Sequence, residues 1–429
     1  MKRFWIVLAA LFTLSAAGIV VLWQGLRQFD MVVQADGDIL YWIVQADYPE
    51  QRDDSPFSWL LSGGGPTHIE VLRALETAAS DPSIKGVFLE VHSLPASLGQ
   101  VQELTEAIRR IQREGKPVEA WLSSAGNREY LLAREADVLT MAPEGQLVIP
   151  GLSAEMTFLA GTLDKLGMEA DYVHVGRYKS APESYERREP SEPHREMVDS
   201  LLDDQFDWLL EAGSEARGLE EDAVRDLVDR GLFDADAALS SGLVDAVGYL
   251  PDTLGQAVPP GGTVGLDDDA LVRSGEGRGP RVSLIHVTGA IVDGESSSGG
   301  WRGPSAGSWT VIDQLQTAYD DDEVRAVLLR IDSPGGSALA SDLIWNEVRA
   351  LRAFKPGVVC TGGGAAPGRY YVACAADSVL ASGGRFTGPT GASAGQLDRS
   401  GCYESASLPG SLPVRVRPLS LLSVIVRLS

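Results

Sequence analysis

The sequence contains two copies of one pattern, and this duplication limits the possible folds more than any other feature. The segment that begins at Ile84 (IKGVFLEV) resembles the segment that begins 240 residues later at Val324 (VRAVLLRI). At the same spacing, the segment from Tyr130 (YLLAREAD) resembles the one from Tyr370 (YYVACAAD), and a Lys-Pro pair recurs between them, one residue out of register. Three matches in one order, two at a spacing of 240 and one at 239, indicate a duplicated domain.

Each copy reads as alternating strands and helices. The apolar runs Val87–Val91 and Val327–Ile331 are typical of buried parallel strands. After the first run, apolar residues recur at intervals of three and four, which predicts a helix that buries Val101, Leu104, Ile108 and Ile111. Further strands are expected at Val118–Leu122 and Asp137–Met141. The alternation predicts an α/β fold with right-handed crossovers.

The repeat also sets the predicted domain boundaries in this chain of 429 residues. We assign residues 31–250 to the first domain and 281–402 to the second, with residues 251–280, rich in Gly, Pro and Asp, as a linker. The first copy continues with further helical and turn-and-strand segments that the second copy lacks. Residues 405–429 contain no Asp, Glu or Lys, so 403–429 are predicted to be an aberrant tail.

The N-terminus predicts a membrane anchor. Lys2 and Arg3 precede Phe4–Trp23, a run of 20 uncharged residues that is long enough to span a hydrocarbon core of roughly 30 Å. A cleavable signal peptide is the alternative, because Ser15-Ala16-Ala17 supplies small residues, but the apolar run is long for one. We therefore expect residues 1–30 to be a single transmembrane anchor in the cytoplasmic membrane, with the body facing the periplasm or cell exterior.

Charge and cysteine content exclude several classes of protein. With 36 Lys and Arg against 60 Asp and Glu, the net charge is −24, so nucleic acid is not an expected partner. Cys360, Cys374 and Cys402 do not have metal-ligand spacing, and the five histidines include no HExxH motif. We therefore predict no metal and no cofactor.

A glycine-rich turn is the first candidate for chemistry. Asp332-Ser333-Pro334 and two glycines, Gly335 and Gly336, follow the predicted strand and precede a helix predicted at Asp342–Leu351. Glycines let backbone N–H groups approach a ligand, and donors near a helix start can stabilise an oxyanion. An ordinary strand-to-helix turn is the alternative interpretation of this segment alone.

Several of these features together resemble one family. The apolar N-terminal run, the duplicated domain, the segment RIDSPGGS, the segment YYVACAAD and GRYKSA at 176–181 resemble the long, two-domain type of signal peptide peptidase A, or protease IV. The resemblance extends from the N-terminus to about Gln396. It implies a duplicated fold like that of Clp proteases and crotonases, and a serine/lysine catalytic dyad. It also implies signal peptides as substrates and a membrane-anchored homo-oligomer, a tetramer in the family.

The resemblance makes Lys179, within GRYKSA, the general base. A lysine can accept a proton near neutral pH only if a dry site or a nearby positive charge lowers its pKa. Arg177 is close in sequence, and the apolar run Tyr172–Val175 is predicted to supply a buried strand. A solvated surface lysine is the alternative for any single lysine.

The nucleophile of the family is missing. Pro367 occupies the expected serine position, and Arg369 replaces a glycine. Proline has no hydroxyl group and no N–H. Gly335, Gly336 and Gly368 remain as the oxyanion-hole residues that the resemblance implies. Because each replacement needs one base change and the tail resembles a shifted reading frame, we favour a sequence error or a decayed gene over an evolved new role.

Three functions therefore compete. The first is a membrane-anchored serine endopeptidase family member that degrades released signal peptides and other envelope peptides, inactive with Pro367 in place. The second is a catalytically dead membrane scaffold or peptide-binding homologue. The third, an acyl-CoA enzyme with the same fold, is disfavoured because the body is expected outside the cytoplasm. The segment Gly391–Gly395 fits a GxSxG motif, but no histidine follows it in the chain, so we reject that hydrolase interpretation.

Overall fold

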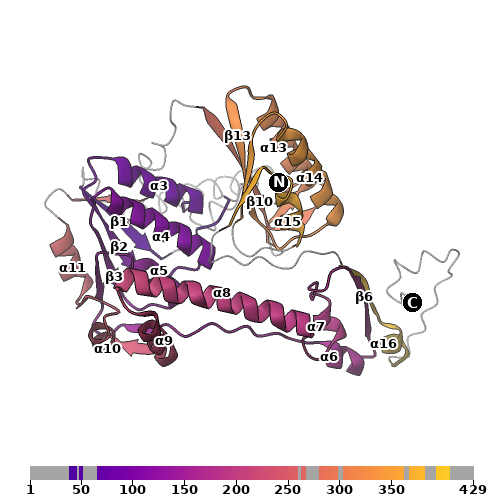
Figure 1. Ribbon diagram of the computed structural model, residues 1–429, viewed down its shortest axis with the longest axis horizontal. Coiled ribbons are helices and arrows are strands. Elements are labelled where there is room, and N and C mark those ends of the chain that lie inside the picture. The colour runs from indigo at the N-terminus through magenta and orange to yellow at the C-terminus, as the bar shows by residue number, and fades with distance from the viewer. Residues whose placement is uncertain are drawn as a thin grey trace, which may run out of the picture.

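The computed structural model describes two α/β units and an arm (Figure 1). The described residues are 38–45, 48–51, 65–258, 262–266, 280–297, 303–361, 367–381 and 393–405. The predicted anchor, Phe4–Trp23, and all but the first residues of the predicted tail lie outside these ranges. Within them, no helix combines the length and the apolar character that crossing a membrane requires.

The first unit is built on a six-stranded parallel sheet with the order β8-β4-β3-β2-β1-β9. Its strands are β1 Ile39–Val44, β2 Gly86–Val91, β3 Val118–Leu122, β4 Val138–Met141, β8 Ala246–Val247 and β9 Thr263–Gly265. Every residue of β2 is buried, as its apolar run predicts for a central strand.

Helices cover both faces of this sheet. They are α3 His68–Ser80, α4 Leu98–Arg113, α5 Asn127–Ala133 and α11 Leu250–Ala257. Thr67 and Ser97 begin α3 and α4 with capping boxes, and all four predicted apolar positions of α4 are buried. On the other face, α11 packs against a cluster formed by Ile39, Phe88 and Trp121.

The second unit repeats the first in strand order. Its parallel sheet runs β10-β13-β14-β15, which is the order β1-β2-β3-β4 of the first sheet. Its strands are β10 Arg281–Thr288, β13 Val324–Asp332, β14 Gly357–Thr361 and β15 Ser378–Leu380. The shared order supports the duplication that the sequence predicts, and each unit has its own apolar core.

The helices repeat at the predicted spacing. Those of the second unit are α13 Ser308–Asp320, α14 Ala338–Leu351, α15 Pro367–Ala373 and α16 Ser400–Ser405. Each begins 240 residues after its counterpart, namely α3, α4, α5 and α6 (Ala160–Lys165). The repeat therefore continues beyond the sheet, into the short helix near the end of the described chain.

The recurring Lys-Pro pair has a structural role. The Lys116 ammonium group donates to the carbonyl oxygen of Ala78 at 2.6 Å, and Lys355 donates to that of Ala318 at 2.7 Å. Both carbonyls lie in the last turn of a helix, where hydrogen-bond partners inside the helix run out and the helix dipole favours a cation. The two lysines thus cap equivalent helices, α3 and α13.

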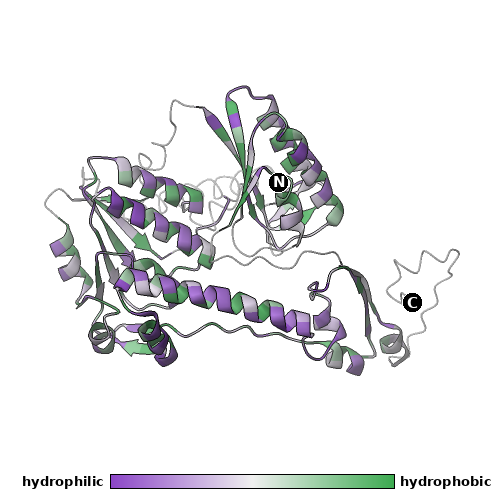
Figure 2. Ribbon diagram, in the orientation of Figure 1, coloured by the Kyte–Doolittle hydropathy of each residue, from purple (hydrophilic) through white to green (hydrophobic). Residues whose placement is uncertain are grey.

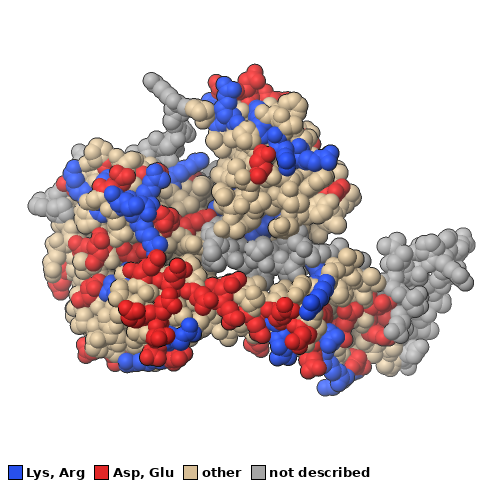
Figure 3. Space-filling model, in the orientation of Figure 1, with Lys and Arg blue, Asp and Glu red and all other residues tan. Residues whose placement is uncertain are grey.

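An arm extends from the first unit (Figure 1). It contains α6, β6 Glu169–His174, α7 Glu183–Glu186 and the long helix α8 Glu192–Arg217. At its far end, β16 Ser393–Asp398 of the second copy pairs antiparallel with β6. Hydrophilic residues dominate α8 (Figure 2), and acidic side chains gather over it (Figure 3).

Shorter elements complete the two units. They are β5 Gln146–Val148, β7 Leu232–Asp234, α9 Glu221–Arg230, α10 Ala235–Ser240, β11 Ala290–Val292 and β12 Ser305–Gly307. β5 pairs antiparallel with β7, whereas β11 pairs parallel with β12.

Three expectations need correction. Residues 251–280 were predicted to be a linker, but they contain most of α11 and all of β9. Because β9 pairs with β1, the first unit continues through Leu266. The helix predicted from Asp342 begins at Ala338, because the Ser337 side chain caps it. Of the predicted buried strand Tyr172–Val175, the residues up to His174 belong to β6, but the run is not buried: Val173 and Val175 are 62% and 71% exposed. It lies on the arm, away from either core.

Candidate active site

The glycine-rich turn is a tight loop between β13 and α14. Gly335 and Gly336 have φ angles of 90° and 157°, which side-chain-bearing residues rarely adopt. A Cβ atom built at Gly336 would lie 2.0 Å from the Ile291 carbonyl oxygen. Ile291 also donates its N–H to Gly335 O at 2.9 Å and accepts from Ser337 N at 2.8 Å. The loop therefore requires glycine and is fixed against β11.

The start of α15 lies directly against this loop. A Cβ atom built at Gly368 would be 3.1 Å from the Gly335 Cα and 3.3 Å from the Gly336 nitrogen. The structure thus brings together all three glycines that the sequence singles out, although 32 residues separate Gly336 from Gly368. We call Gly335, Gly336 and Gly368 the glycine pocket.

Two backbone donors of the glycine pocket make no hydrogen bond to another described residue. The Gly335 N–H donates to Ser333 Oγ at 3.0 Å. Within the described ranges, neither the Gly336 N–H nor the Gly368 N–H has a hydrogen-bond partner. Two neighbouring backbone N–H groups are the kind of donor pair that can stabilise an oxyanion or bind a peptide carbonyl. The sequence alone does not distinguish Gly335 from Gly336. In the structure they differ, because the hydrogen bond to Ser333 occupies the N–H of Gly335.

Pro367, which stands where the nucleophile is expected, is the first residue of α15. Two described hydroxyls of this region belong to Ser333 and Ser341, which are each 1% exposed. Ser333 Oγ accepts the Gly335 N–H, and Ser341 Oγ donates to Ser337 O at 2.9 Å. Both hydroxyls therefore have structural hydrogen bonds and are shielded from solvent, so neither replaces the missing serine.

Arg369 is hydrogen-bonded to the loop that carries Gly335 and Gly336. Its side chain is 1% exposed, and its Nε and Nη2 atoms donate to Ser333 O at 3.2 and 2.9 Å. The same guanidinium lies 3.8 Å from the Asp332 carboxylate. A charged group this deeply buried needs such partners. Sequence reasoning identified Arg369 only as a departure from the family and did not predict this role.

Lys179 lies in the loop between β6 and α7. Its side chain is half-buried, and this desolvation lowers the pKa of its ammonium group. The neighbouring Arg177 is paired with Glu196 at 3.3 Å and lies over the Tyr178 ring. In the part of the chain that the structure describes, no contact joins Lys179 to the glycine pocket. Its assignment as the general base stays a prediction.

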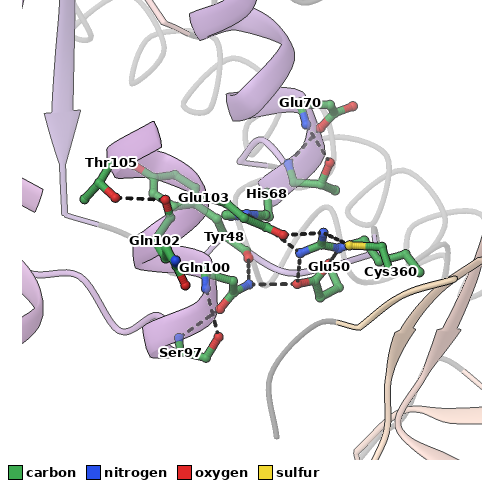
Figure 4. Close-up of polar contacts among 12 residues, drawn as sticks. Tyr48, Glu50, His68, Glu70, Ser97, Gln100, Gln102, Glu103, Thr105 and Cys360 are labelled. Carbon is green, nitrogen blue, oxygen red and sulfur yellow. Dashed lines mark hydrogen bonds and ion pairs between the residues drawn. The ribbon is translucent and has the colours of Figure 1, made fainter. Parts of the chain in front are cut away.

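A buried ion cluster connects the two units (Figure 4). Arg330, on β13, is 5% exposed and pairs with Glu50 and Glu103 of the first unit. Its Nη2 lies 2.8 Å from an oxygen of each glutamate, and His68 Nε2 lies 2.8 Å from Glu103. Burial lowers the pKa of Arg330, but the hydrogen bonds to both glutamates outweigh it and raise this pKa overall. The cluster fixes β13, and hence the loop that follows it, against the first unit.

The described residues contain no group of His, Cys, Asp and Glu side chains arranged to hold a metal ion. Among the described residues, the Gly336 and Gly368 N–H groups have no partner and could donate to a carbonyl oxygen, but the described side chains supply no nucleophile beside them.

Comparison with known proteins places these features in context. Residues 110–258 match the profile described as "Peptidase family S49". The chain is 29% identical over 341 residues to "Serine protease SPPA, chloroplastic" of Arabidopsis thaliana, covering 76% of this chain and 50% of that protein. It is 31% identical over 353 residues to "Protease 4" of Haemophilus influenzae, covering 75% and 55%. The chain thus spans about half the length of the curated relatives it matches.

Proposed function

Because this chain belongs to peptidase family S49, we propose that it has the architecture of a membrane-anchored serine endopeptidase for released signal peptides and other envelope peptides. With Pro367 in place, we propose further that it does not hydrolyse them. The observation that supports this proposal is the glycine pocket: the Gly336 and Gly368 backbones lie close together, and the residue before Gly368 has no hydroxyl group.

The proposed mechanism is based on the dyad that the family resemblance implies. A serine at position 367, deprotonated by Lys179, would attack the peptide carbonyl while the Gly336 and Gly368 N–H groups stabilise the oxyanion. The amine would leave with a proton, and water would then release the acyl group. Lys179 could act as the base because burial lowers its pKa. In this chain the proposed base and the oxyanion-hole glycines are present, and the serine is missing.

Restoring the nucleophile tests the assignment. We expect a fluorophosphonate probe to leave the natural chain unlabelled and to label Pro367→Ser, with or without Arg369→Gly. Adding Lys179→Ala should remove most labelling and most hydrolysis of a peptide ester, because a neutral serine is a poor nucleophile. Labelling of the natural chain at another serine, such as Ser393, would show that the nucleophile lies elsewhere. No labelling of either restored chain would contradict the pocket assignment.

The second candidate function is peptide binding without cleavage. The free Gly336 and Gly368 N–H groups favour it, since binding a carbonyl needs no nucleophile. A peptide aldehyde and its alcohol analogue should then bind the natural chain with similar affinity, because no hydroxyl is available to add to the aldehyde. A strong preference for the aldehyde would instead reveal an active nucleophile.

The membrane anchor and self-association belong to the same proposal. The run Phe4–Trp23 supports an anchor in the cytoplasmic membrane with the body outside, and the family resemblance supports a homo-oligomer. A reporter fused after residue 30 should be exported and stay in the membrane fraction after an alkaline wash. Recovery of a soluble body would instead indicate cleavage.

A further inference from the structure

The outer edge of the second sheet is open among the described residues. β15 ends the strand order β10-β13-β14-β15, and no described strand pairs with its far side. Val379 and Leu380 of β15 are 44% and 56% exposed, and Tyr370 of the preceding helix, α15, is 47% exposed. Apolar side chains beside an open strand edge are typical of a surface to which another strand can be added.

The first unit shows what covers the equivalent surface there. At the spacing of 240, Tyr130 and Leu139 correspond to Tyr370 and Val379, but they are only 6% and 0% exposed. Residues 243–247, which end in β8, are hydrogen-bonded to both of them and extend the sheet beyond β4. The comparison of the two units therefore identifies an extended segment as the kind of ligand that this surface accommodates.

Three hydrogen bonds hold the segment in the first unit. The Tyr130 hydroxyl donates to the Leu243 carbonyl oxygen at 2.9 Å. The Leu139 N–H donates to the Asp245 carboxylate at 2.8 Å, and the Asp245 N–H donates to the Leu139 carbonyl oxygen at 2.8 Å. Leu243 and Val244 are buried in the core of the unit. The aspartate thus satisfies both backbone groups of one edge residue, and the apolar pair before it fills the core.

The second unit retains the receiving groups. By correspondence with Leu139, the N–H and carbonyl groups of Val379 face the open edge, where no described strand lies. In the part of the chain that the structure describes, the Tyr370 hydroxyl has no hydrogen-bond partner either. The second unit therefore has the same tyrosine hydroxyl and the same edge position that bind the segment in the first unit.

Charge favours an acidic group in the ligand. In the first unit, Gln112 lines the same hollow as Asp245. Its counterpart in the second unit is Arg352, and the exposed Arg349 lies one turn earlier. Asp377 pairs with Arg352 at 3.6 Å, so the two arginines and this acid together leave a net positive charge. An aspartate bound at the edge of β15 would therefore lie near an excess of positive charge, which is electrostatically favourable.

We propose that the outer edge of β15 binds an extended segment of a partner polypeptide, parallel to β15, in which an aspartate directly follows two apolar residues. The aspartate accepts the Val379 N–H near Arg352, and the carbonyl oxygen of the first apolar residue accepts the Tyr370 hydroxyl. Residues 243–245 of this chain have the pattern, but Leu243 is buried in the first unit. The ligand is therefore a separate polypeptide.

A peptide copied from the first unit serves as the probe. A fluorescein-labelled peptide of residues 240–248 (SSGLVDAVG) should bind the full chain in detergent, as measured by fluorescence anisotropy. Asp245→Ala in the peptide should weaken binding at least about tenfold, because a hydrogen bond to a charged group is lost. Ser240→Ala in the peptide is the matched control and should have little effect. These peptide variants test the site without changing the protein.

Substitutions in the second unit locate the binding site. Val379→Pro removes the N–H that the aspartate accepts, at an outward-facing edge position where proline is tolerated, and should weaken binding at least about tenfold. Tyr370→Phe should weaken binding about two- to tenfold, because one hydrogen bond is lost. Tyr319→Phe, at an exposed tyrosine of α13, is the matched control and should leave the affinity unchanged.

Cross-linking identifies the residues that the peptide contacts. A benzophenone on the peptide should attach to residues 370–380 of the chain. Attachment to residues 130–141 would show that the peptide exchanges into the first unit, and an unchanged affinity in Val379→Pro would place it elsewhere, for example at the glycine pocket. Either result, or no binding at millimolar peptide, would overturn the proposal. These readouts do not measure hydrolysis, so they are independent of the fluorophosphonate test.

Discussion

Glu129 and Arg369 occupy the same position in the two copies, 240 residues apart, and each reaches from the start of a helix to the loop after the central strand. Glu129 Oε1 accepts the Leu94 N–H at 2.8 Å, whereas Arg369 donates to the Ser333 carbonyl at 2.9 Å. The charges are opposite because the backbone groups that they meet are opposite. Arg369 replaces a glycine of the family, but it makes the same kind of side chain-to-loop hydrogen bond as Glu129 in the first unit. The side chain is the donor in one case and the acceptor in the other.

Removing the Arg369 hydrogen bonds should destabilise the second unit. Arg369→Met leaves the buried Ser333 carbonyl without its donor, which we expect to cost about 1–3 kcal/mol of unfolding free energy. Urea unfolding followed by the fluorescence of Trp345, with the other tryptophans replaced, would measure the loss. Arg325→Met, at an exposed position of β13, is the control and should stay within about 0.5 kcal/mol. Equal effects would mean that Arg369 does not support the loop.

A methyl group at Gly368 should disturb the glycine pocket. In Gly368→Ala, the new Cβ would lie 3.1 Å from both the Gly335 Cα and Ser341 Oγ, so the loop or α15 must shift. We expect a destabilisation of about 1–3 kcal/mol and weaker binding of a peptide aldehyde. Gly357→Ala, where a built Cβ meets nothing within 4 Å, is the matched control for unfolding and binding. An unchanged affinity in Gly368→Ala would argue against peptide binding at this pocket.

Breaking the ion cluster should loosen the two units from each other. Arg330→Met leaves Glu50 and Glu103 close together without their shared cation, and loss of one partner of a buried pair typically costs about 3–5 kcal/mol. Limited proteolysis should then release the second unit earlier than in the natural chain. Adding Glu50→Gln and Glu103→Gln to Arg330→Met should recover part of the resistance, since the buried negative charges are gone. Without such recovery, the effect would not be electrostatic.

The lowered pKa of Lys179 has a measurable consequence. Because the pKa of Lys179 is lower in the folded than in the unfolded chain, its protonated amine destabilises the folded state at low pH. This destabilisation disappears as the pH rises through the pKa of the unfolded chain. The neutral, reactive fraction of Lys179 should therefore appear at a lower pH than in the unfolded chain. Acetylation by acetic anhydride at pH 8 to 9, quantified by mass spectrometry, should modify Lys179 faster in the folded than in the urea-unfolded protein.

The exposed Lys165 provides the reference for that measurement. The ratio of the Lys179 rate to the Lys165 rate should fall on unfolding. A ratio that rises instead would show that burial restricts access more than it changes the proton equilibrium.

The sequence predicts the sheet framework well because that framework depends on local patterns. The spacing of Val101, Leu104, Ile108 and Ile111 requires one buried helical face, and α4 buries all four. Tyr172–Val175 was wrong as a buried strand, because an apolar run does not reveal whether a core lies beside it. The Arg330 cluster was not predicted, since its partners, Glu50 and Glu103, are distant in sequence and acidic residues are numerous in this chain.

The candidate site shows the same division. Gly335, Gly336 and Gly368 could be identified from sequence, because a strand–turn–helix pattern and the family resemblance point to them. Which N–H groups remain free depends on the Ser333 hydroxyl, whose orientation follows from the folded loop. No sequence pattern indicates that Arg369 turns inward rather than toward solvent.

The pairing of β1 with β9 determines when the first unit can be completed during synthesis. Ile39 lies opposite Thr263, so one edge of the sheet closes only after more than 220 further residues have followed β1 out of the ribosome. Helix α11, which packs over Phe88 and Trp121, is also synthesised only shortly before β9. A chain under synthesis must therefore keep an open strand edge and an uncovered apolar face until the segment between the copies emerges. This interval is when chaperones or an export machinery could hold the polypeptide unfolded.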